Sequence, residues 1–124
     1  MVSCARCDED YPYEQLFDFS LSVAEKYGRA GVAFQPYFPV GWNPRPWKVW
    51  KPSFVLPDRE QIAISVRRLT DVLNKYDSLG IADRGRNIAK GFTMYCWNEF
   101  GEGGFLAPTI RDGFAKLEGL RDAI

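Results

Sequence analysis

Residues 94–104 read Met-Tyr-Cys-Trp-Asn-Glu-Phe-Gly-Glu-Gly-Gly. The apolar part of this stretch ends at Trp97, and a polar part follows with two carboxylates, Glu99 and Glu102, among three glycines. The pattern is typical of a strand that ends in a tightly turned loop. Because α/β proteins place much of their chemistry on loops at strand ends, we expect this loop to carry the function.

Three helices and two strands are predicted around this loop. Apolar residues at helical spacing predict helices over 11–27, 58–76 and 111–123. Apolar runs predict strands over 31–40 and 91–97, and two prolines in the first run indicate that its strand ends near Tyr37. The second strand is apolar on both faces, which is typical of a parallel strand covered by helices. Asp58 is the expected N-cap of the second helix, and residues 79–90 read as an irregular connector rich in glycine and charge. The apolar side of the last helix is predicted from four residues: Phe114, Leu117, Leu120 and Ile124.

The order helix-strand-helix-strand-helix predicts an α/β fold. Alternating elements of this kind imply parallel strands joined by a right-handed crossover. Two strands alone make a marginal sheet with two open edges. We therefore interpret residues 1–124 as a single partial domain, the C-terminal portion of a TIM (β/α)8 barrel, with another chain as a candidate for completing it. Residues 1–10 are expected to form an exposed or disordered N-terminal segment.

A second loop is predicted over residues 41–57. It holds Trp42, Trp47 and Trp50, together with four prolines and Arg45. Structureless loops of this length are uncommon in compact domains unless they are functional. Flat indole rings suit the apolar C–H faces of sugars, so a glycan contact is one interpretation of the tryptophans. The alternative is that the indoles pack on neighbouring segments.

Composition excludes several classes of function. Sixteen basic and sixteen acidic residues cancel, so the chain has no electrostatic footprint for nucleic acid or for an anionic membrane. No apolar stretch is long enough for a transmembrane helix, no secretory signal is visible, and the compartment stays open. The chain has no histidine, which removes Ser-His-Asp and Cys-His catalysis and leaves acid–base chemistry to carboxylates, tyrosines or lysines.

Three cysteines are present, two of them in a lone Cys-x-x-Cys at the N-terminus. Cys4 and Cys7 could form a redox or zinc pair, but a zinc site needs four ligands and only Cys96 remains. Free thiols in an exposed segment are the preferred interpretation. The sequence therefore predicts no metal site.

Two motifs together resemble a known family of enzymes. Residues 95–104, followed by Phe-Leu-Ala-Pro-Thr at 105–109 and a helix at 113–117, resemble the final strand and helix of glycoside hydrolase family 99-like barrels and of the related WbsX-like group. Residues 38–47, Phe-Pro-Val-Gly-Trp-Asn-Pro-Arg-Pro-Trp, are similar to the loop after the preceding strand. The resemblance spans residues 32–124 and implies the last part of a (β/α)8 barrel that acts on glycans.

The resemblance also implies roles for individual residues. Glu99 would act as the base toward the 2-hydroxyl of an α-mannoside. Glu102 would protonate the leaving oxygen and then activate water, a route outside the usual two-carboxylate scheme. No metal or organic cofactor is implied. The residues expected to contact the sugar are Trp42, Asn43, Arg45, Trp47, Trp97 and Asn98.

The chain departs from the family pattern at two informative positions. Gly101 stands where the enzymes carry a histidine, and Asn43 stands where an acidic residue is usual. These differences favour a divergent, WbsX-like relative. Two alternatives stay open: a non-catalytic carbohydrate-binding or assembly module, and a glycosyltransferase of polysaccharide biosynthesis, for which no glycine-rich nucleotide loop follows a strand.

Overall fold

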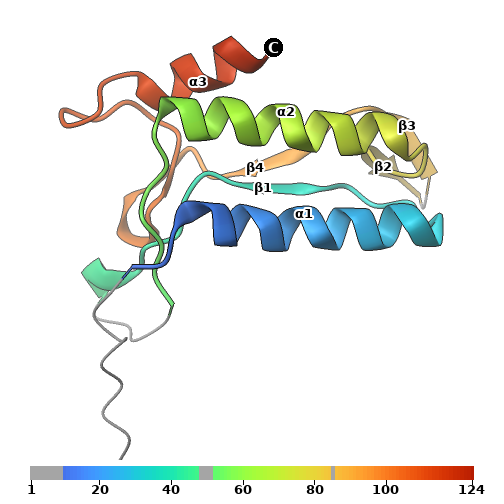
Figure 1. Cartoon of the computed structure of the whole chain (residues 1–124), viewed down its shortest axis with the longest axis horizontal. Coiled ribbons are helices and arrows are strands. Elements are labelled where there is room, and N and C mark those ends of the chain that lie inside the picture. The colour runs from blue at the N-terminus through green and yellow to red at the C-terminus, as the bar shows by residue number, and fades with distance from the viewer. Residues whose placement is uncertain (1–9, 48–51, 85) are drawn as a thin grey trace, which may run out of the picture.

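Three helices pack around a pair of short parallel strands in the computed structural model of the protein, which describes residues 10–47, 52–84 and 86–124 (Figure 1). The predicted α/β class is confirmed. Cys4, Cys7 and Trp50, and the predicted segment up to residue 9, lie outside the described residues. The elements in chain order are α1 (Tyr13–Ala30), β1 (Tyr37–Pro39), the 3-10 helix η1 (Arg45–Trp47), α2 (Arg59–Lys75), β2 (Ile81–Asp83), β3 (Arg86–Ala89), β4 (Thr93–Tyr95), β5 (Asn98–Glu99), the 3-10 helix η2 (Phe100–Glu102), β6 (Gly104–Phe105) and α3 (Ala115–Ala123).

The start of α2 is fixed by a capping box. The Asp58 carboxylate accepts a 2.8 Å hydrogen bond from the Gln61 N–H, and the Gln61 side chain accepts a 2.9 Å bond from the Asp58 N–H. Two N–H groups that the helix leaves unpaired are thereby satisfied. The predicted N-cap is confirmed, and the helix ends one residue before Tyr76.

α1 begins and ends slightly later than the sequence predicts. Pro12 precedes its first turn, and Gly31 ends it with a left-handed φ of 67°. Tyr13 is fully buried at its start, and its hydroxyl donates a 2.8 Å hydrogen bond to the Pro39 carbonyl oxygen. This bond fixes the first turn of α1 against the end of β1.

β1 and β4 form a parallel pair in which Phe38 lies opposite Met94. The predicted parallel pairing is confirmed, but β1 begins at Tyr37, where the first strand was expected to end, and β4 is shorter than the predicted strand. Pro36 and Pro39 lack the N–H group that a longer β1 would use in pairing. α1 and α2 supply the helical cover for this pair, and α3 packs on α2 (Figure 1).

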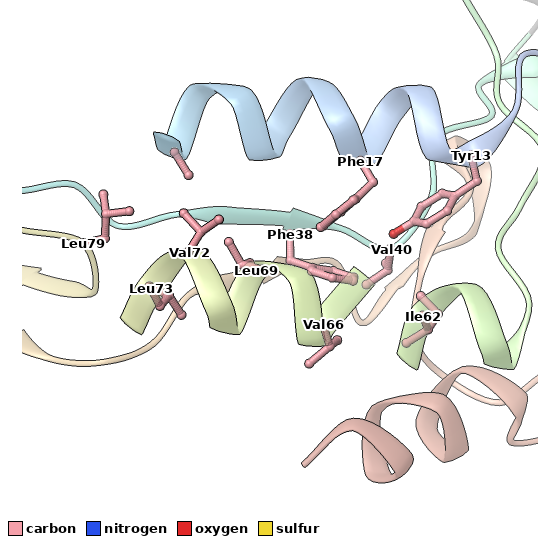
Figure 2. Packing of buried hydrophobic residues seen from close by; sticks show 11 residues of the cluster. Tyr13, Phe17, Phe38, Val40, Ile62, Val66, Leu69, Val72, Leu73 and Leu79 are labelled. Atoms are coloured by element: carbon pink, nitrogen blue, oxygen red, sulfur yellow. The ribbon is translucent and has the colours of Figure 1, made fainter. Parts of the chain in front are cut away.

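One face of the strand pair carries the hydrophobic core. Phe38 in β1 and Val40 directly after it project among the apolar residues of α1 and α2 and are fully buried (Figure 2). Successive strand residues point to opposite faces, so the neighbours of these residues lie on the other side of the sheet. Thr93 and Trp97 are exposed, and the prediction that both faces of 91–97 are buried is wrong. We call this second side the open face.

Two hairpins were not expected from the sequence. β2 and β3 pair antiparallel within the segment predicted to be irregular, and β5 and β6 pair antiparallel inside the polar loop after β4. The β2–β3 hairpin is held against the end of α2 by Lys90, which follows β3. The Lys90 amine donates hydrogen bonds to the carbonyl oxygens of Leu73 (2.8 Å) and Tyr76 (2.9 Å). The strands of this hairpin are short and mostly exposed, so they lack the hydrophobic alternation that identifies a strand.

α3 begins at Ala115, four residues later than predicted, because a turn pairs Thr109 with Gly113. Its contact with α2 is made by Gly119, where an added Cβ would overlap the Arg59 carbonyl oxygen. The predicted apolar side is partly wrong, since Phe114 is 62% exposed. The residues of α3 that are buried or pack on the core are Lys116, Gly119, Leu120 and Ala123.

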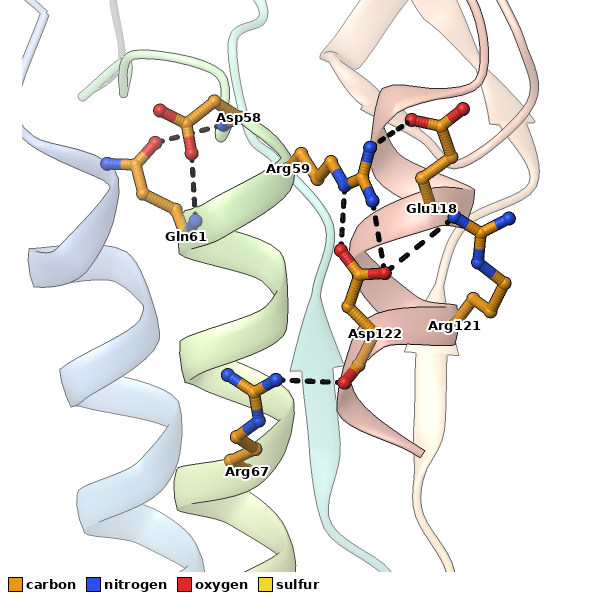
Figure 3. Close-up of polar contacts among 7 residues, drawn as sticks. All are labelled: Asp58, Arg59, Gln61, Arg67, Glu118, Arg121 and Asp122. Atoms are coloured by element: carbon orange, nitrogen blue, oxygen red, sulfur yellow. Dashed lines mark hydrogen bonds and ion pairs between the residues drawn. The ribbon is translucent and has the colours of Figure 1, made fainter.

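An ion-pair cluster closes the outer side of the α2–α3 contact (Figure 3). Arg59 Nε lies 2.7 Å from an Asp122 carboxylate oxygen, and Arg59 Nη1 lies 2.8 Å from Glu118. Arg67 donates a 2.8 Å hydrogen bond to the Asp122 carbonyl oxygen.

Among the described residues, no helix is long and apolar enough to span a membrane.

Candidate functional site

The two loops singled out in the sequence meet at the carboxyl ends of β1 and β4. The Asn43 N–H donates a 2.6 Å hydrogen bond to the Glu102 carbonyl oxygen. Trp47 lies against Gly101, where an added Cβ would overlap the indole ring. Gly41 and Gly103 touch through their backbones and have φ values of 151° and 71°, which glycine adopts without strain. The glycines therefore permit the close approach of the two loops.

The predicted carboxylates lie in a compact hairpin formed by residues 98–105, which we call the acidic hairpin. Its strands pair Asn98 with Phe105 and Glu99 with Gly104. The 3-10 turn η2 connects them and ends at Glu102. Glu99 and Glu102 thus stand at the two sides of one tight turn.

The base of the acidic hairpin is held by a buried lysine from α3. Lys116 is 5% exposed, and its amine donates hydrogen bonds to the carbonyl oxygens of Phe105 (2.7 Å) and Val40 (3.2 Å). The same amine lies 3.7 Å from the centre of the Phe105 ring, a favourable cation–π arrangement. Burial lowers the pKa of Lys116 to about 8, and the charge of Asp112 partly opposes this shift.

Glu102 is anchored on the open face by a tyrosine. The Tyr95 hydroxyl donates a 2.8 Å hydrogen bond to Oε2 of Glu102. This bond is the main reason that the pKa of Tyr95 is raised to about 12, and the charges of Glu102 and Glu99 add to it. Glu102 is thus in direct contact with Tyr95, and Glu99 stands across the same turn of the hairpin.

Tyr37 is a second tyrosine beside this contact. Its ring centre lies 6.2 Å from that of Tyr95, with an interplanar angle of 32°. Burial raises the pKa of Tyr37, and the charges of Cys96 and Glu102 contribute to the rise. Further along the open face, the Gln35 side chain donates a hydrogen bond to the Thr93 hydroxyl. The open face is therefore lined by polar and aromatic groups that end at Glu102.

The six predicted sugar-contact residues lie in different surroundings. Trp47 and Trp97 are 61% and 54% exposed and present large apolar surfaces near the acidic hairpin. Trp42 is half-buried, and Asn98 is exposed in β5. The remaining two, Asn43 and Arg45, contact Asp10.

Asn43 and Arg45 are bound to a residue that the sequence did not single out. Arg45 Nε lies 2.9 Å from one carboxylate oxygen of Asp10, and the Asn43 side-chain amide donates a 3.3 Å hydrogen bond to the other. Asn43 also accepts a 3.3 Å bond from the Arg45 N–H. Asp10 thus orders the start of the second loop.

A hollow of about 490 Å³ lies beside this loop, between the starts of α2 and α3. Neither Glu99 nor Glu102 lines it, so the predicted carboxylates do not belong to this hollow. Within the described residues, no group of three or more histidine, cysteine or acidic side chains is placed to hold a metal ion. The lining residues are Asp10, Asn43, Val55, Leu56, Pro57, Asp58, Arg111, Asp112, Ala115 and Lys116.

Sequence reasoning missed three residues of the site. Tyr37 and Tyr95 occupy odd positions of two strands whose even positions are apolar, and this alternation was the available signal. Lys116 gave no signal, because a lysine in an amphipathic helix normally faces solvent.

Comparisons with protein-family models, curated proteins and solved structures find no match to this chain. A proposal of function therefore depends on the residues of the site and on the resemblance of its motifs.

Proposed function

We propose that the chain is the C-terminal portion of a (β/α)8-barrel glycoside hydrolase-like domain and that the acidic hairpin carries its two catalytic carboxylates. The observation that carries the proposal is the hydrogen bond from Tyr95 to Glu102 at the carboxyl ends of two parallel strands. Enzymes of the barrel class hold their catalytic residues at this end of the strands. The two strand-end loops also meet there, as a shared active site requires.

The two carboxylates have different roles in this proposal. Glu102 is the acid/base that protonates the leaving oxygen and later activates water. The Tyr95 hydroxyl fixes the orientation of its carboxylate, because the bond uses Oε2 and leaves Oε1 for the substrate. Glu99 is the base toward the sugar 2-hydroxyl, by resemblance to the family 99 enzymes. Two glutamates on one turn of a rigid hairpin can address neighbouring atoms of one sugar.

The substrate class follows from the groups around the hairpin. The exposed indoles of Trp47 and Trp97 offer apolar faces for sugar C–H groups. We therefore propose a glycan as the substrate.

The barrel part of the proposal rests on the open face and the two-stranded sheet. In a closed barrel, the inward face of each strand points to side chains of the other strands, and both edges are paired. Here Tyr37 and Thr93 point away from the helices and are exposed. Further strand–helix units, from the same protein or from another chain, would cover them.

The test is hydrolysis of a panel of aryl glycosides and oligosaccharides by the full chain. Glu102→Gln is expected to lower turnover by about 100-fold or more while glycan affinity is kept, since the amide cannot donate the acidic proton. Glu60→Gln, an exposed carboxylate in the first turn of α2, is the matched control and should keep wild-type turnover. Equal turnover in wild type and Glu102→Gln would exclude the catalytic role.

A non-catalytic glycan-binding module is the second candidate, favoured by the exposure of Trp47 and Trp97. The same panel separates the two functions. Binding that is lost in Trp47→Ala, without turnover in the wild type, would support the binding module. Turnover that depends on Glu102 would support the enzyme.

A further inference from the structure

We infer that Lys116 is a positioning residue that holds the acidic hairpin against the end of β1 while it is charged and loosens that hold when it loses its proton. This inference rests on the proposed function, because it concerns the hairpin that carries Glu99 and Glu102. The Lys116 amine donates to main-chain carbonyl oxygens, so it acts on the two glutamates through the backbone of the hairpin.

The geometry places Lys116 at the base of the hairpin. Its two acceptors are the carbonyl oxygens of Val40, directly after β1, and of Phe105, in β6. Phe105 pairs with Asn98 across the hairpin, so a contact that holds Phe105 also holds the opposite strand. The tip is held separately by the Asn43 N–H on the Glu102 carbonyl oxygen. Without Lys116, the base of the hairpin loses a cross-link to β1.

The strength of this cross-link depends on charge. Hydrogen bonds from a charged amine are roughly twice as strong as those from a neutral one. The cation–π contact with the Phe105 ring, at 3.7 Å, exists only for the charged form. Loss of one proton therefore weakens both contacts to Phe105 at once, while the neutral amine can still donate a hydrogen bond.

The surroundings allow this proton to leave near neutral pH. Burial is the main cause that lowers the pKa of Lys116 to about 8, well below that of an exposed lysine. Lys116 lines the hollow of about 490 Å³ between the starts of α2 and α3, so water has access to the start of α3. The charged groups that share the hollow come from every element packed around it: Asp10 before α1, Asp58 before α2, and Arg111 and Asp112 before α3. Of these groups, Asp112 carries the charge that favours the protonated lysine and partly opposes the effect of burial on its pKa.

The first test follows the proton and the hairpin in the wild-type chain. Carbon-13 NMR of lysine Cε and of glycine Cα is recorded between about pH 6.5 and 9.5, a range that brackets the shifted value and stays below an ordinary lysine. We expect the Lys116 Cε signal to titrate with a midpoint near 8, and the Cα signals of Gly101 and Gly104 to move with the same midpoint. A Lys116 signal that does not titrate in this range, or hairpin glycines that do not follow it, would overturn the inference.

The second test uses variants at position 116. Lys116→Met keeps the aliphatic stem and removes the charge, so the hairpin glycines should lose the transition near pH 8. Lys116→Arg keeps a charge that does not titrate in this range and should also abolish the transition. Because the two variants test the same point, one of them suffices if the other folds poorly. A glycine transition with an unchanged midpoint in either variant would show that another group causes it.

The activity profile separates this inference from the proposed function. Wild-type turnover of the responsive glycoside should fall as pH rises through about 8, and Lys116→Arg should move the fall to higher pH. Turnover with an identical pH profile in Lys116→Arg would contradict the positioning role and leave the enzyme proposal intact. No turnover in any variant, with a glycine transition that depends on Lys116, would contradict the enzyme proposal and keep the positioning role of the lysine.

Discussion

The hydroxyl group of Tyr95 donates a 2.8 Å hydrogen bond to Oε2 of Glu102, seven residues further along the chain. The bond joins a strand that ends at Tyr95 to the turn of the hairpin that follows it. A phenol that donates to a carboxylate resists ionisation, because its anion would face a like charge. The hydrogen bond therefore predicts a raised pKa for Tyr95, which a titration can measure.

Tyr95 is expected to stay protonated at pH values where an ordinary tyrosine ionises. Its pKa is raised from 10.0 to about 12, with the hydrogen bond to Glu102 as the largest cause. Glu102→Gln removes the charge and should return the midpoint toward 10. The measurement is NMR of tyrosine labelled at Cζ, with Tyr95→Phe to assign the signal. A midpoint that is the same in wild type and Glu102→Gln would contradict the contact.

Gly119→Ala should destabilise the protein, although alanine is the better helix former. An added Cβ would overlap the Arg59 carbonyl oxygen and lie 3.0 Å from Ile62 Cβ, so α3 must move away from α2. Overpacking costs about 1–3 kcal/mol, and the gain in helix propensity offsets about 1 kcal/mol of it. Urea unfolding should give a lower midpoint for this variant.

Arg121→Ala is the control for the Gly119 experiment. Arg121 is exposed on the same helix, and surface changes of this kind stay within about 0.5 kcal/mol. A Gly119→Ala variant as stable as the wild type would mean that α2 and α3 are not packed at this distance.

Stability should rise with pH between about 8 and 10 because of Lys116. Its pKa is near 8 in the folded protein and 10.5 when exposed, so the unfolded chain binds more protons in this interval. The shift corresponds to at most about 3 kcal/mol of unfolding free energy, gained as pH rises. Urea unfolding at several pH values should show this slope in the wild type and lose it in Lys116→Met. An equal slope in both proteins would assign the effect to another group.

This global gain does not conflict with a looser acidic hairpin at high pH. Deprotonation removes the free-energy penalty of a buried charge, which stabilises the whole fold. The same event weakens the hydrogen bonds and the cation–π contact of Lys116 with Phe105. Local order and global stability should therefore change in opposite directions near pH 8.

Asp122→Asn should destabilise the α2–α3 contact, and the effect should depend on salt and pH. Arg59 donates to both carboxylate oxygens of Asp122, at 2.7 and 3.1 Å, and this bond is the main cause of the lowered pKa of Asp122. A lowered pKa means a contribution that is present at neutral pH and lost as pH falls through the folded value. Thermal unfolding should show a gap between variant and wild type that narrows in acid and at high salt.

Asp71→Asn is the control for this pair, because Asp71 is an exposed carboxylate on α2 that is not one of the ion-pair partners of Arg59. It should unfold like the wild type under all these conditions. If both variants lose the same stability, general charge balance rather than the Arg59 contact would be responsible.

The sequence predicted the larger elements well and the smaller ones poorly. α2 was predicted almost to its ends, because Asp58 and the apolar stripe are strong local signals. β1 was expected to end near Tyr37 and instead begins there, and β4 covers only part of the strand predicted over 91–97. The β2–β3 hairpin is stabilised by Lys90 bonding to the end of α2, a tertiary contact with no local pattern.

The candidate site was predicted in outline only. Glu99 and Glu102 were identified from their spacing among glycines, and the meeting of the two loops followed from the strand ends. Tyr95 was assigned to a strand buried on both faces, which hid its role as the partner of Glu102. Lys116 could not be identified, because its acceptors are backbone atoms that lie 11 and 76 residues away in the sequence.

The acidic hairpin is attached to the rest of the protein chiefly through main-chain atoms. The Asn43 N–H binds the Glu102 carbonyl oxygen at the tip, and the Lys116 amine binds the Phe105 carbonyl oxygen at the base. Both acceptors are main-chain atoms, so they remain when the side chains of Asn98, Glu99 or Phe100 are exchanged. Mutation can therefore exchange the groups shown to a ligand while the loop keeps its place. The hairpin backbone can therefore present different side chains from the same position. It is suited to laboratory selection of new specificities from libraries varied at Trp97, Asn98 and neighbouring positions.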